Sequence, residues 1–166
     1  MPSGNARQGD DVLRDRGSKP WRNTLFANGY MAYETLPEEV KRRIVGRRAL
    51  NAYQTDTTLR SASYDGGGSS YWHPVVRTHP ATGRKALYVN RLMTREIEGL
   101  PRTESDAILQ LLFDHQEQAG FVYEHVWRPG DVIIWDNRCT LHARTDFSAG
   151  ERRLLQRVTI QGERPL

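Results

Sequence analysis

One histidine and two arginines near the end of the chain have the types and spacing needed to bind a metal beside a carboxylate. His142 lies in a short apolar run, and Arg153 and Arg157 follow across a polar turn. Side chains four apart on a strand share one face, so the two guanidiniums should point the same way. Their charges repel unless an anion lies beside them, and a guanidinium matches a carboxylate bidentately. A neutral imidazole is a good ligand for iron(II), so the pattern indicates a metal next to a carboxylate-bearing small molecule.

The same three residues also have an ordinary structural interpretation. A single histidine in a protein is more often a surface or satisfied core residue than a metal ligand. Arginines on an edge strand are usually solvated. The residues alone therefore leave both interpretations open.

Short apolar runs separated by turn residues predict that the second half of the chain is mostly strand. The predicted strands cover residues 74–77, 86–89, 122–127, 131–135, 140–143 and 152–160. Pro80–Gly83 should join the first two strands as a hairpin, and Pro129–Gly130 should join the third and fourth. The strand of His142 should pair with the strand of Arg153 and Arg157. Ser105 should cap a helix that carries one apolar face, formed by Ile108, Leu111, Leu112 and His115.

The first half of the chain is predicted to be more helical. Residues 1–21 contain few apolar residues and are predicted to be a disordered or non-native leader. Thr24 should cap a first helix, and Thr35 to Glu38 resembles a capping box for a second helix that ends near Leu50. Residues 54–70 should form a long loop. Several short antiparallel strands with a few helices predict a mainly β fold with flanking helices, close to a jelly roll.

Several segments resemble the TauD/TfdA family of iron(II)- and 2-oxoglutarate-dependent dioxygenases. The likeness runs in order from Thr24 to Pro165. Its segments are Thr24–Asn28, His73–Pro80, Gly83–Asn90, Trp135-Asp136-Asn137-Arg138, and then His142, Arg153 and Arg157. An ordered series of this length is far more specific than any one motif.

The resemblance implies a partial double-stranded β-helix, which is a cupin-like jelly roll. It also implies roles for four residues. His142 would be the distant histidine that binds Fe(II), Thr24 and Arg153 would hold 2-oxoglutarate, and Arg157 would lie near both the cosubstrate and the acidic group of the substrate. The implied reaction hydroxylates a small, anionic organic substrate, such as taurine or another sulfonate, and releases succinate and CO2.

One part of the family pattern has no counterpart in this sequence. The family holds iron with a His-x-Asp pair in addition to the distant histidine, but none of the five histidines here begins a His-x-Asp. Residues 22–166 are therefore predicted to be the C-terminal portion of a dioxygenase domain, inactive by themselves. The alternative is a non-catalytic remnant or pseudoenzyme that binds a partner.

Other candidate residues carry weaker hypotheses. His73 and His79 are expected to be structural, and Cys139 is expected to be a small packing residue. Nothing in the sequence links His125 to a metal. Trp72 and Tyr64 border the glycine-rich segment and are candidates for lining a substrate pocket.

Composition narrows the classes of partner. The net charge is +4 with a pI near 9.5, but the arginines are mixed with acidic residues, which argues against nucleic acid. A single cysteine excludes an internal disulfide. No apolar run is long enough to span a membrane, and no secretory signal is evident, so the cytoplasm is expected. The sequence leaves a homo-oligomer open.

Overall fold

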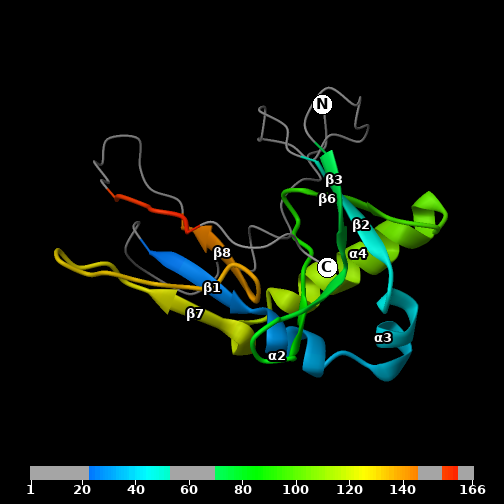
Figure 1. The fold of residues 1–166 in the computed structure, drawn as a ribbon, viewed down its shortest axis with the longest axis horizontal. Coiled ribbons are helices and arrows are strands. Elements are labelled where there is room, and N and C mark those ends of the chain that lie inside the picture. Colours follow the sequence, from blue (N-terminus) through cyan, green and yellow to red (C-terminus); the bar gives the residue numbers. More distant parts are fainter. Residues whose placement is uncertain (1–22, 53–69, 146–154, 161–166) are drawn as a thin grey trace, which may run out of the picture.

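The computed structural model describes residues 23–52, 70–145 and 155–160 (Figure 1). The leader predicted at 1–21, nearly all of the predicted loop at 54–70, and Arg153 lie outside these ranges. The elements are, in order, β1 (Thr24–Asn28), α2 (Gly29–Glu34), α3 (Glu38–Ile44), β2 (Arg48–Ala52), β3 (Ser70–Pro74), β4 (Val76–Thr78), β5 (Lys85–Leu87), β6 (Thr94–Ile97), α4 (Arg102–Gln116), the 3-10 helix η1 (Ala119–Phe121), β7 (Val122–His125) and β8 (Thr140–Arg144).

Among the described residues, the strands form three small antiparallel sheets. Their orders are β7-β1-β8, β3-β2-β6 and β4-β5. The first sheet lies at one end of the molecule in Figure 1, and the second lies with α3 and α4 at the other end. Strands with a few flanking helices match the predicted fold class.

The hydrophobic core lies around α4 and the strands next to it. Leu109, Leu112 and Phe113 of α4 are almost fully buried together with Ile44 and Ile97. Each such side chain contributes roughly 1.5–3 kcal/mol when fully buried. The core therefore belongs to the α4 end of the molecule, whereas the sheet that contains β1 reaches beyond it.

Helix α4 exists as predicted, but its first residue and its buried face differ from the prediction. Ser105 does not cap the helix, because α4 begins at Arg102 after Pro101. The buried Ser105 hydroxyl instead accepts a hydrogen bond from the backbone N–H of Ile97, at 2.8 Å. Leu111 is exposed rather than on the buried face. The Nε2–H of His115 donates to the carbonyl of Ala32, at 3.0 Å, and so ties α4 to α2.

The predicted helix at Thr24 is wrong, because Thr24 begins the central strand of a sheet. The helix that follows is short and starts after Asn28, whose side chain accepts hydrogen bonds from the N–H groups of Tyr30 and Met31. Leu25 and Ala27 are buried between neighbouring strands. Pairing on both edges therefore overrides the local helical pattern.

The second predicted helix is correct only in its middle. It covers Glu38–Ile44, and Pro37 precedes it without a side-chain cap. The Thr35 hydroxyl donates to the carbonyl of Met31 instead of capping α3. Gly46, with φ of 70°, stops the chain from continuing as a helix. The residues up to Leu50 enter β2, where β3 and β6 pair with them.

The predictions for the remaining strands had mixed outcomes. The hairpin of β4 and β5 and the turn at Pro129–Gly130 are confirmed. The predicted strand at 122–127 ends at His125. No strand is assigned at 131–135 or at 155–160, so the predicted pairing of the His142 strand with 152–160 is not seen in the described part. There, β8 pairs with β1 instead. No helix in the described ranges meets the length and hydrophobicity needed to cross a membrane.

Gly29 should be the least replaceable glycine of the described part. Its N–H donates to the carbonyl of Cys139 at 2.8 Å, and an added Cβ would lie 2.8 Å from that same oxygen. Gly29→Ala should therefore push the start of β8 away from α2 and cost about 1–3 kcal/mol of unfolding free energy. Gly120→Ala is the matched control, because a Cβ there meets nothing within 4 Å. Urea unfolding followed by circular dichroism measures both, and equal midpoints would contradict the prediction.

Candidate functional site

Two of the predicted site residues, Thr24 and His142, lie on one face of the β7-β1-β8 sheet. Thr24 lies directly opposite His125 of β7 and Arg144 of β8, and Phe26 lies directly opposite His142. Directly opposed residues of an antiparallel pair project to the same side of the sheet. The structure therefore brings Thr24 and His142 to a common face, on neighbouring strands.

His142 is half-buried between two aromatic rings. Its imidazole centroid lies 5.1 Å from the ring of Trp135 and 6.4 Å from the ring of Phe26. Burial lowers the pKa of His142 below its ordinary value, and the positive charge of Arg157 lowers it further. His142 is therefore neutral at pH 7, which is the form that binds a metal. Among the described residues, this electrostatic effect is the interaction that connects Arg157 with His142. The side chain of Arg157 is itself exposed.

The hydroxyl of Thr24 is held by a tryptophan that the sequence did not single out. Thr24 is buried, and the indole Nε1–H of Trp127 donates to its Oγ1 at 2.9 Å. An indole N–H can only donate, so the Thr24 oxygen is the acceptor and its own hydrogen is directed elsewhere. Trp127 thereby fixes the orientation of a hydroxyl at the predicted cosubstrate position.

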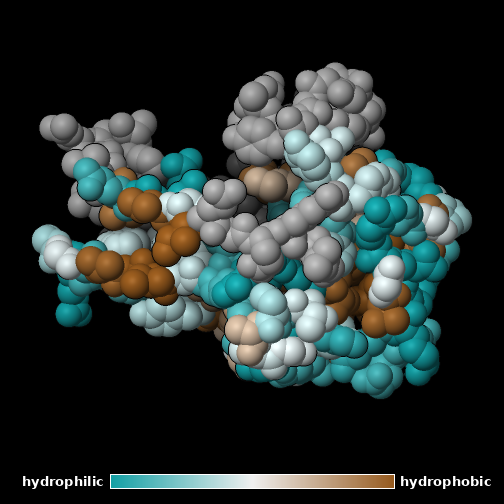
Figure 2. Space-filling view, viewed as in Figure 1, coloured by the Kyte–Doolittle hydropathy of each residue, from teal (hydrophilic) through white to brown (hydrophobic). Residues whose placement is uncertain are grey.

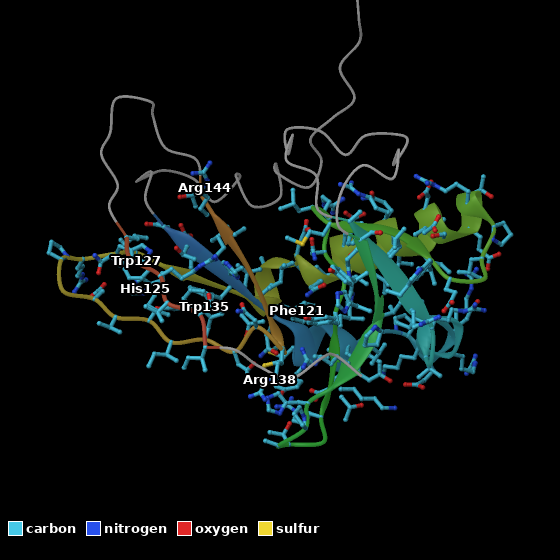
Figure 3. All side chains as sticks on the ribbon, turned by 45° about the horizontal axis from the view of Figure 1, so that its top comes forward. Phe121, His125, Trp127, Trp135, Arg138 and Arg144 are labelled. Carbon is cyan, nitrogen blue, oxygen red and sulfur yellow. The ribbon has the colours of Figure 1, made fainter. Side chains whose placement is uncertain are left out.

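Trp127 is fixed in turn by His125. The two rings meet edge-on, with centroids 4.8 Å apart (Figure 3). The Nε2–H of His125 donates to Asp131 at 3.0 Å, and Nδ1 accepts from the Tyr123 hydroxyl at 3.2 Å. A backbone N–H from Arg128, followed by the bond from His125, lowers the pKa of Asp131. His125 therefore has a positioning role and uses both ring nitrogens within the protein.

Asp136, from the family-like segment before β8, is held in an ion pair. The Arg138 guanidinium binds it at 2.6 Å, and the Nε2–H of His79 donates to it at 3.0 Å. Mainly because of Arg138, the pKa of Asp136 lies well below its usual range. His79 is buried and accepts a further bond from the N–H of Ala81. The cluster connects the turn after β4 to the segment before β8, which agrees with a structural role for His79.

The remaining candidates lie away from this face. His73 packs edge-on against Tyr88 with ring centroids 5.9 Å apart. Trp72 is partly exposed beside Arg48, and Tyr64 lies outside the described residues. Cys139 is half-buried, and its carbonyl receives the Gly29 bond, which is consistent with a packing role.

The described residues offer one candidate iron ligand, His142, rather than a full set. His142 is sheltered and neutral, which fits one ligand position. No group of three or more His, Cys, Asp or Glu side chains that could hold a metal occurs within the described ranges. The described residues therefore fit only part of an iron site. The remaining ligands would have to come from residues outside the described ranges or from another polypeptide.

Three comparisons place the chain among known proteins. The family model "Taurine catabolism dioxygenase TauD, TfdA family" matches residues 23–159. The chain is 36% identical over 147 residues to the alpha-ketoglutarate-dependent 2,4-dichlorophenoxyacetate dioxygenase of Burkholderia sp. (strain RASC), covering 86% of this chain and 49% of that protein. It is 35% identical over 151 residues to the (S)-phenoxypropionate/alpha-ketoglutarate-dioxygenase of Sphingobium herbicidovorans, covering 84% and 52%. The chain thus spans about half the length of these curated relatives.

Solved structures show the same likeness. AAD-2 in complex with Mn(II) and N-oxalylglycine matches with a TM-score of 0.78 and 29% identity, covering 90% of this chain and 62% of that one. A taurine dioxygenase from Burkholderia xenovorans matches with a TM-score of 0.66 and 30% identity, covering 76% and 41%. The predicted jelly-roll class is confirmed by these matches.

Proposed function

Because the chain belongs to the TauD/TfdA family of dioxygenases, we propose that it forms part of an iron(II)- and 2-oxoglutarate-dependent dioxygenase. The observation that carries this proposal is the common face of β1 and β8, where Thr24 lies near a sheltered, neutral His142. When bound, iron and 2-oxoglutarate supply the oxidation of a substrate C–H bond, with release of succinate and CO2. The protein residues bind and orient the reactants.

We assign the metal to His142 and the cosubstrate to Thr24 and Arg153. N-oxalylglycine, found in the AAD-2 structure, carries a carboxylate at each end, as 2-oxoglutarate does. A carboxylate accepts hydrogen bonds from a hydroxyl and from a guanidinium. Trp127 already donates to the Thr24 oxygen, so the hydroxyl hydrogen of Thr24 is oriented away from the indole. This orientation of the hydroxyl supports the assignment of Thr24 to a carboxylate of the cosubstrate.

We propose that the substrate is a small organic anion. The relatives are named for 2,4-dichlorophenoxyacetate, phenoxypropionate and taurine, and all three carry a negatively charged acid group. Arg157, whose charge reaches His142, is the residue we assign to that acid group and to the cosubstrate nearby. A basic residue beside the metal ligand favours an anion over a neutral substrate.

We further propose that residues 22–166 act as the C-terminal portion of the domain and that another polypeptide segment completes the iron site. The cytoplasm remains the expected compartment. The second candidate function is a non-catalytic remnant that binds a partner. It is supported by the described ranges, which contain no group of three or more His, Cys, Asp or Glu side chains that could hold a metal.

The test compares the chain alone with an assembled enzyme. We define the assembled enzyme as this chain produced together with the part of the Burkholderia 2,4-dichlorophenoxyacetate dioxygenase that the chain does not match. The assembled enzyme should release succinate from 2-oxoglutarate, whereas the chain alone should bind iron(II) weakly and release none. Chelator-resistant, stoichiometric iron and steady succinate from the chain alone would refute the need for a second segment. No succinate from either sample would favour the non-catalytic alternative.

Trp127→Phe should raise the KM for 2-oxoglutarate in the assembled enzyme while changing kcat little. The variant keeps a ring against His125 but removes the N–H that orients Thr24. One hydrogen bond is worth about 0.5–1.5 kcal/mol, so the expected increase is about two- to tenfold. Trp72→Phe is the control, because Trp72 lies on another sheet. A KM equal to that of the control would contradict the role of Trp127.

Arg157→Ala should weaken binding of the anionic substrate, and Arg157→Lys should restore it only partly. An ammonium carries the charge but cannot reproduce the two parallel N–H donors of a guanidinium. The loss of one charge-assisted contact predicts roughly a tenfold or greater increase in substrate KM. Steady-state kinetics with 2,4-dichlorophenoxyacetate and with taurine measure it. Unchanged constants for both substrate and cosubstrate would show that the assignment is wrong.

A further inference from the structure

One hydrogen bond joins the turn between β4 and β5 to the turn that precedes β8. His79 is buried, and its Nδ1 accepts from the backbone N–H of Ala81 at 3.2 Å. Because Nδ1 is an acceptor, the ring proton is on Nε2, which donates to Oδ2 of Asp136 at 3.0 Å. The ring of Tyr30 meets His79 edge-on, with centroids 6.1 Å apart. Both ring nitrogens of His79 are thus engaged, and its donor has a fixed direction.

The acceptor, Asp136, belongs to a turn that its own carboxylate stabilises. Oδ1 accepts from the backbone N–H of Arg138 at 2.8 Å, and Oδ2 accepts from its guanidinium at 2.6 Å. The backbone carbonyl of Asp136 accepts from the N–H of Cys139 at 3.3 Å. Among the described residues, the other bonds to this carboxylate also come from Arg138. His79, 57 positions away, is therefore the side chain that ties the turn to another part of the molecule, beside the backbone bond from Gly29 to Cys139.

The same turn carries a ring that contacts the candidate metal ligand. Trp135 immediately precedes Asp136, and its ring centroid lies 5.1 Å from that of His142. The indole N–H of Trp135 also donates to Oδ1 of Asn137 within the turn, at 2.8 Å. The backbone of His142 is held separately, by the pairing of β8 with β1. A shift of the turn would therefore move Trp135 against the His142 imidazole.

Apolar contacts alone do not set the angle of the His142 ring. Phe26 and Trp135 pack on it, and Figure 2 shows hydrophobic groups gathered at the end of the molecule that holds β1, β7 and β8. The hydrophobic effect is non-directional, whereas a hydrogen bond prefers a nearly linear arrangement of donor, hydrogen and acceptor. The bond from His79 to Asp136 therefore supplies a direction that packing lacks.

We propose that His79 is a positioning residue for His142. Its bond to Asp136 holds the turn of residues 136–139 in the place from which Trp135 orients the His142 imidazole. The consequence for the metal rests on the proposed function, in which His142 is the iron ligand. Removing a group that directly supports a metal ligand costs roughly 10–100-fold in affinity or activity. His79 acts through Asp136 and Trp135, so its removal should cost no more than about the lower end of that range.

The experiment compares His79→Phe with two other variants. His79→Phe keeps a ring beside Tyr30 and removes the Nε2–H donor. His79→Gln replaces that donor with an amide N–H and should recover most of the behaviour of the parent. His115→Phe is the matched control, because His115 also donates at 3.0 Å, to the carbonyl of Ala32, but joins α4 to α2.

Two measurements are made on these variants. In the full chain without metal, NMR follows the carbon-bound ring protons of His142, whose chemical shifts report the ring current of Trp135. These resonances should move in His79→Phe, return in His79→Gln and stay unchanged in His115→Phe. In the assembled enzyme, Mn(II) affinity measured by electron paramagnetic resonance should fall about three- to tenfold in His79→Phe and follow the same order among the variants.

Several outcomes would overturn the proposal. Unchanged His142 resonances in His79→Phe, or equal shifts in His115→Phe, would do so. A His79→Gln variant that behaves like His79→Phe would show that the donor does not matter, and shifted resonances with unchanged Mn(II) affinity would show that the orientation does not.

A second variant keeps the test decisive if His79→Phe loses its circular dichroism spectrum. Asp136→Asn weakens the same bond from its acceptor side, so it should shift the same His142 resonances, and unchanged resonances would again overturn the proposal. A parent assembled enzyme that binds no Mn(II), while the resonances shift as expected, would contradict the proposed function and support the positioning role of His79. The two failures are therefore distinguishable.

Discussion

His142→Ala should lower 2-oxoglutarate decarboxylation by the assembled enzyme at least about a hundredfold. Removal of residues that merely support a metal ligand costs roughly 10–100-fold in affinity or activity, and removal of a ligand itself should reach or exceed the upper end. The imidazole is sheltered by Phe26 and Trp135 and is neutral at pH 7. The variant therefore loses a preformed ligand rather than one that must first be deprotonated.

A second readout separates a ligand from a structural histidine. Mn(II) binding, followed by electron paramagnetic resonance, should weaken in His142→Ala by a similar factor. His73→Ala is the matched control, because His73 lies on β3 in a different sheet. The circular dichroism spectra of both variants should match the parent. Unchanged Mn(II) affinity in His142→Ala would remove His142 from the metal site.

Arg153→Ala should raise the KM for 2-oxoglutarate about tenfold or more in the assembled enzyme. Arg153 lies outside the described residues, so its assignment rests on its place in the family pattern. A charge-assisted hydrogen bond is worth about 1.5–3 kcal/mol, and a bidentate guanidinium makes two. Its loss would leave one carboxylate of the cosubstrate without its main partner.

The control for Arg153 is an exposed arginine that is paired within its own helix. Arg102 forms an exposed pair with Asp106 one turn later in α4, at 2.8 Å. Arg102→Ala should leave the KM unchanged, because exposed pairs of this kind contribute little. Isothermal titration with N-oxalylglycine in the presence of Mn(II) gives the same comparison without turnover. Equal affinities for Arg153→Ala and the parent would contradict the assignment.

Local patterns predicted the elements that depend on local contacts. The hairpin of β4 and β5 and the helix α4 follow from turn residues and apolar periodicity within a few residues. The strand at Thr24 could not be found in this way, because its partners β7 and β8 lie far along the chain. The end of the second helix was missed for the same reason, since β2 exists through its pairing with β3 and β6.

The candidate residues of the site could be proposed from the sequence, whereas the contacts that support them could not. A recognisable ordered pattern identified Thr24 and His142, and the structure brings them to one face. The bond from Trp127 to Thr24 depends on the register of β7 against β1 and on the turn that follows β7. The ring of Phe26 meets His142 through the register of β1 against β8, and the ring of Trp135 reaches it from the segment before β8. No spacing rule in the sequence specifies these contacts.

The distance along the chain between β1 and its partner strands also delays the pairing of β1 during synthesis on the ribosome. Its Thr24 binds a residue 103 positions later, and Asn23 binds one 122 positions later. At roughly 5–20 residues per second, translation needs on the order of 5–25 s to deliver these partners. Throughout that interval, the apolar strand that includes Leu25 and Phe26 has neither neighbour. Nascent chains of this protein should therefore depend on a chaperone that binds the β1 segment until β8 emerges.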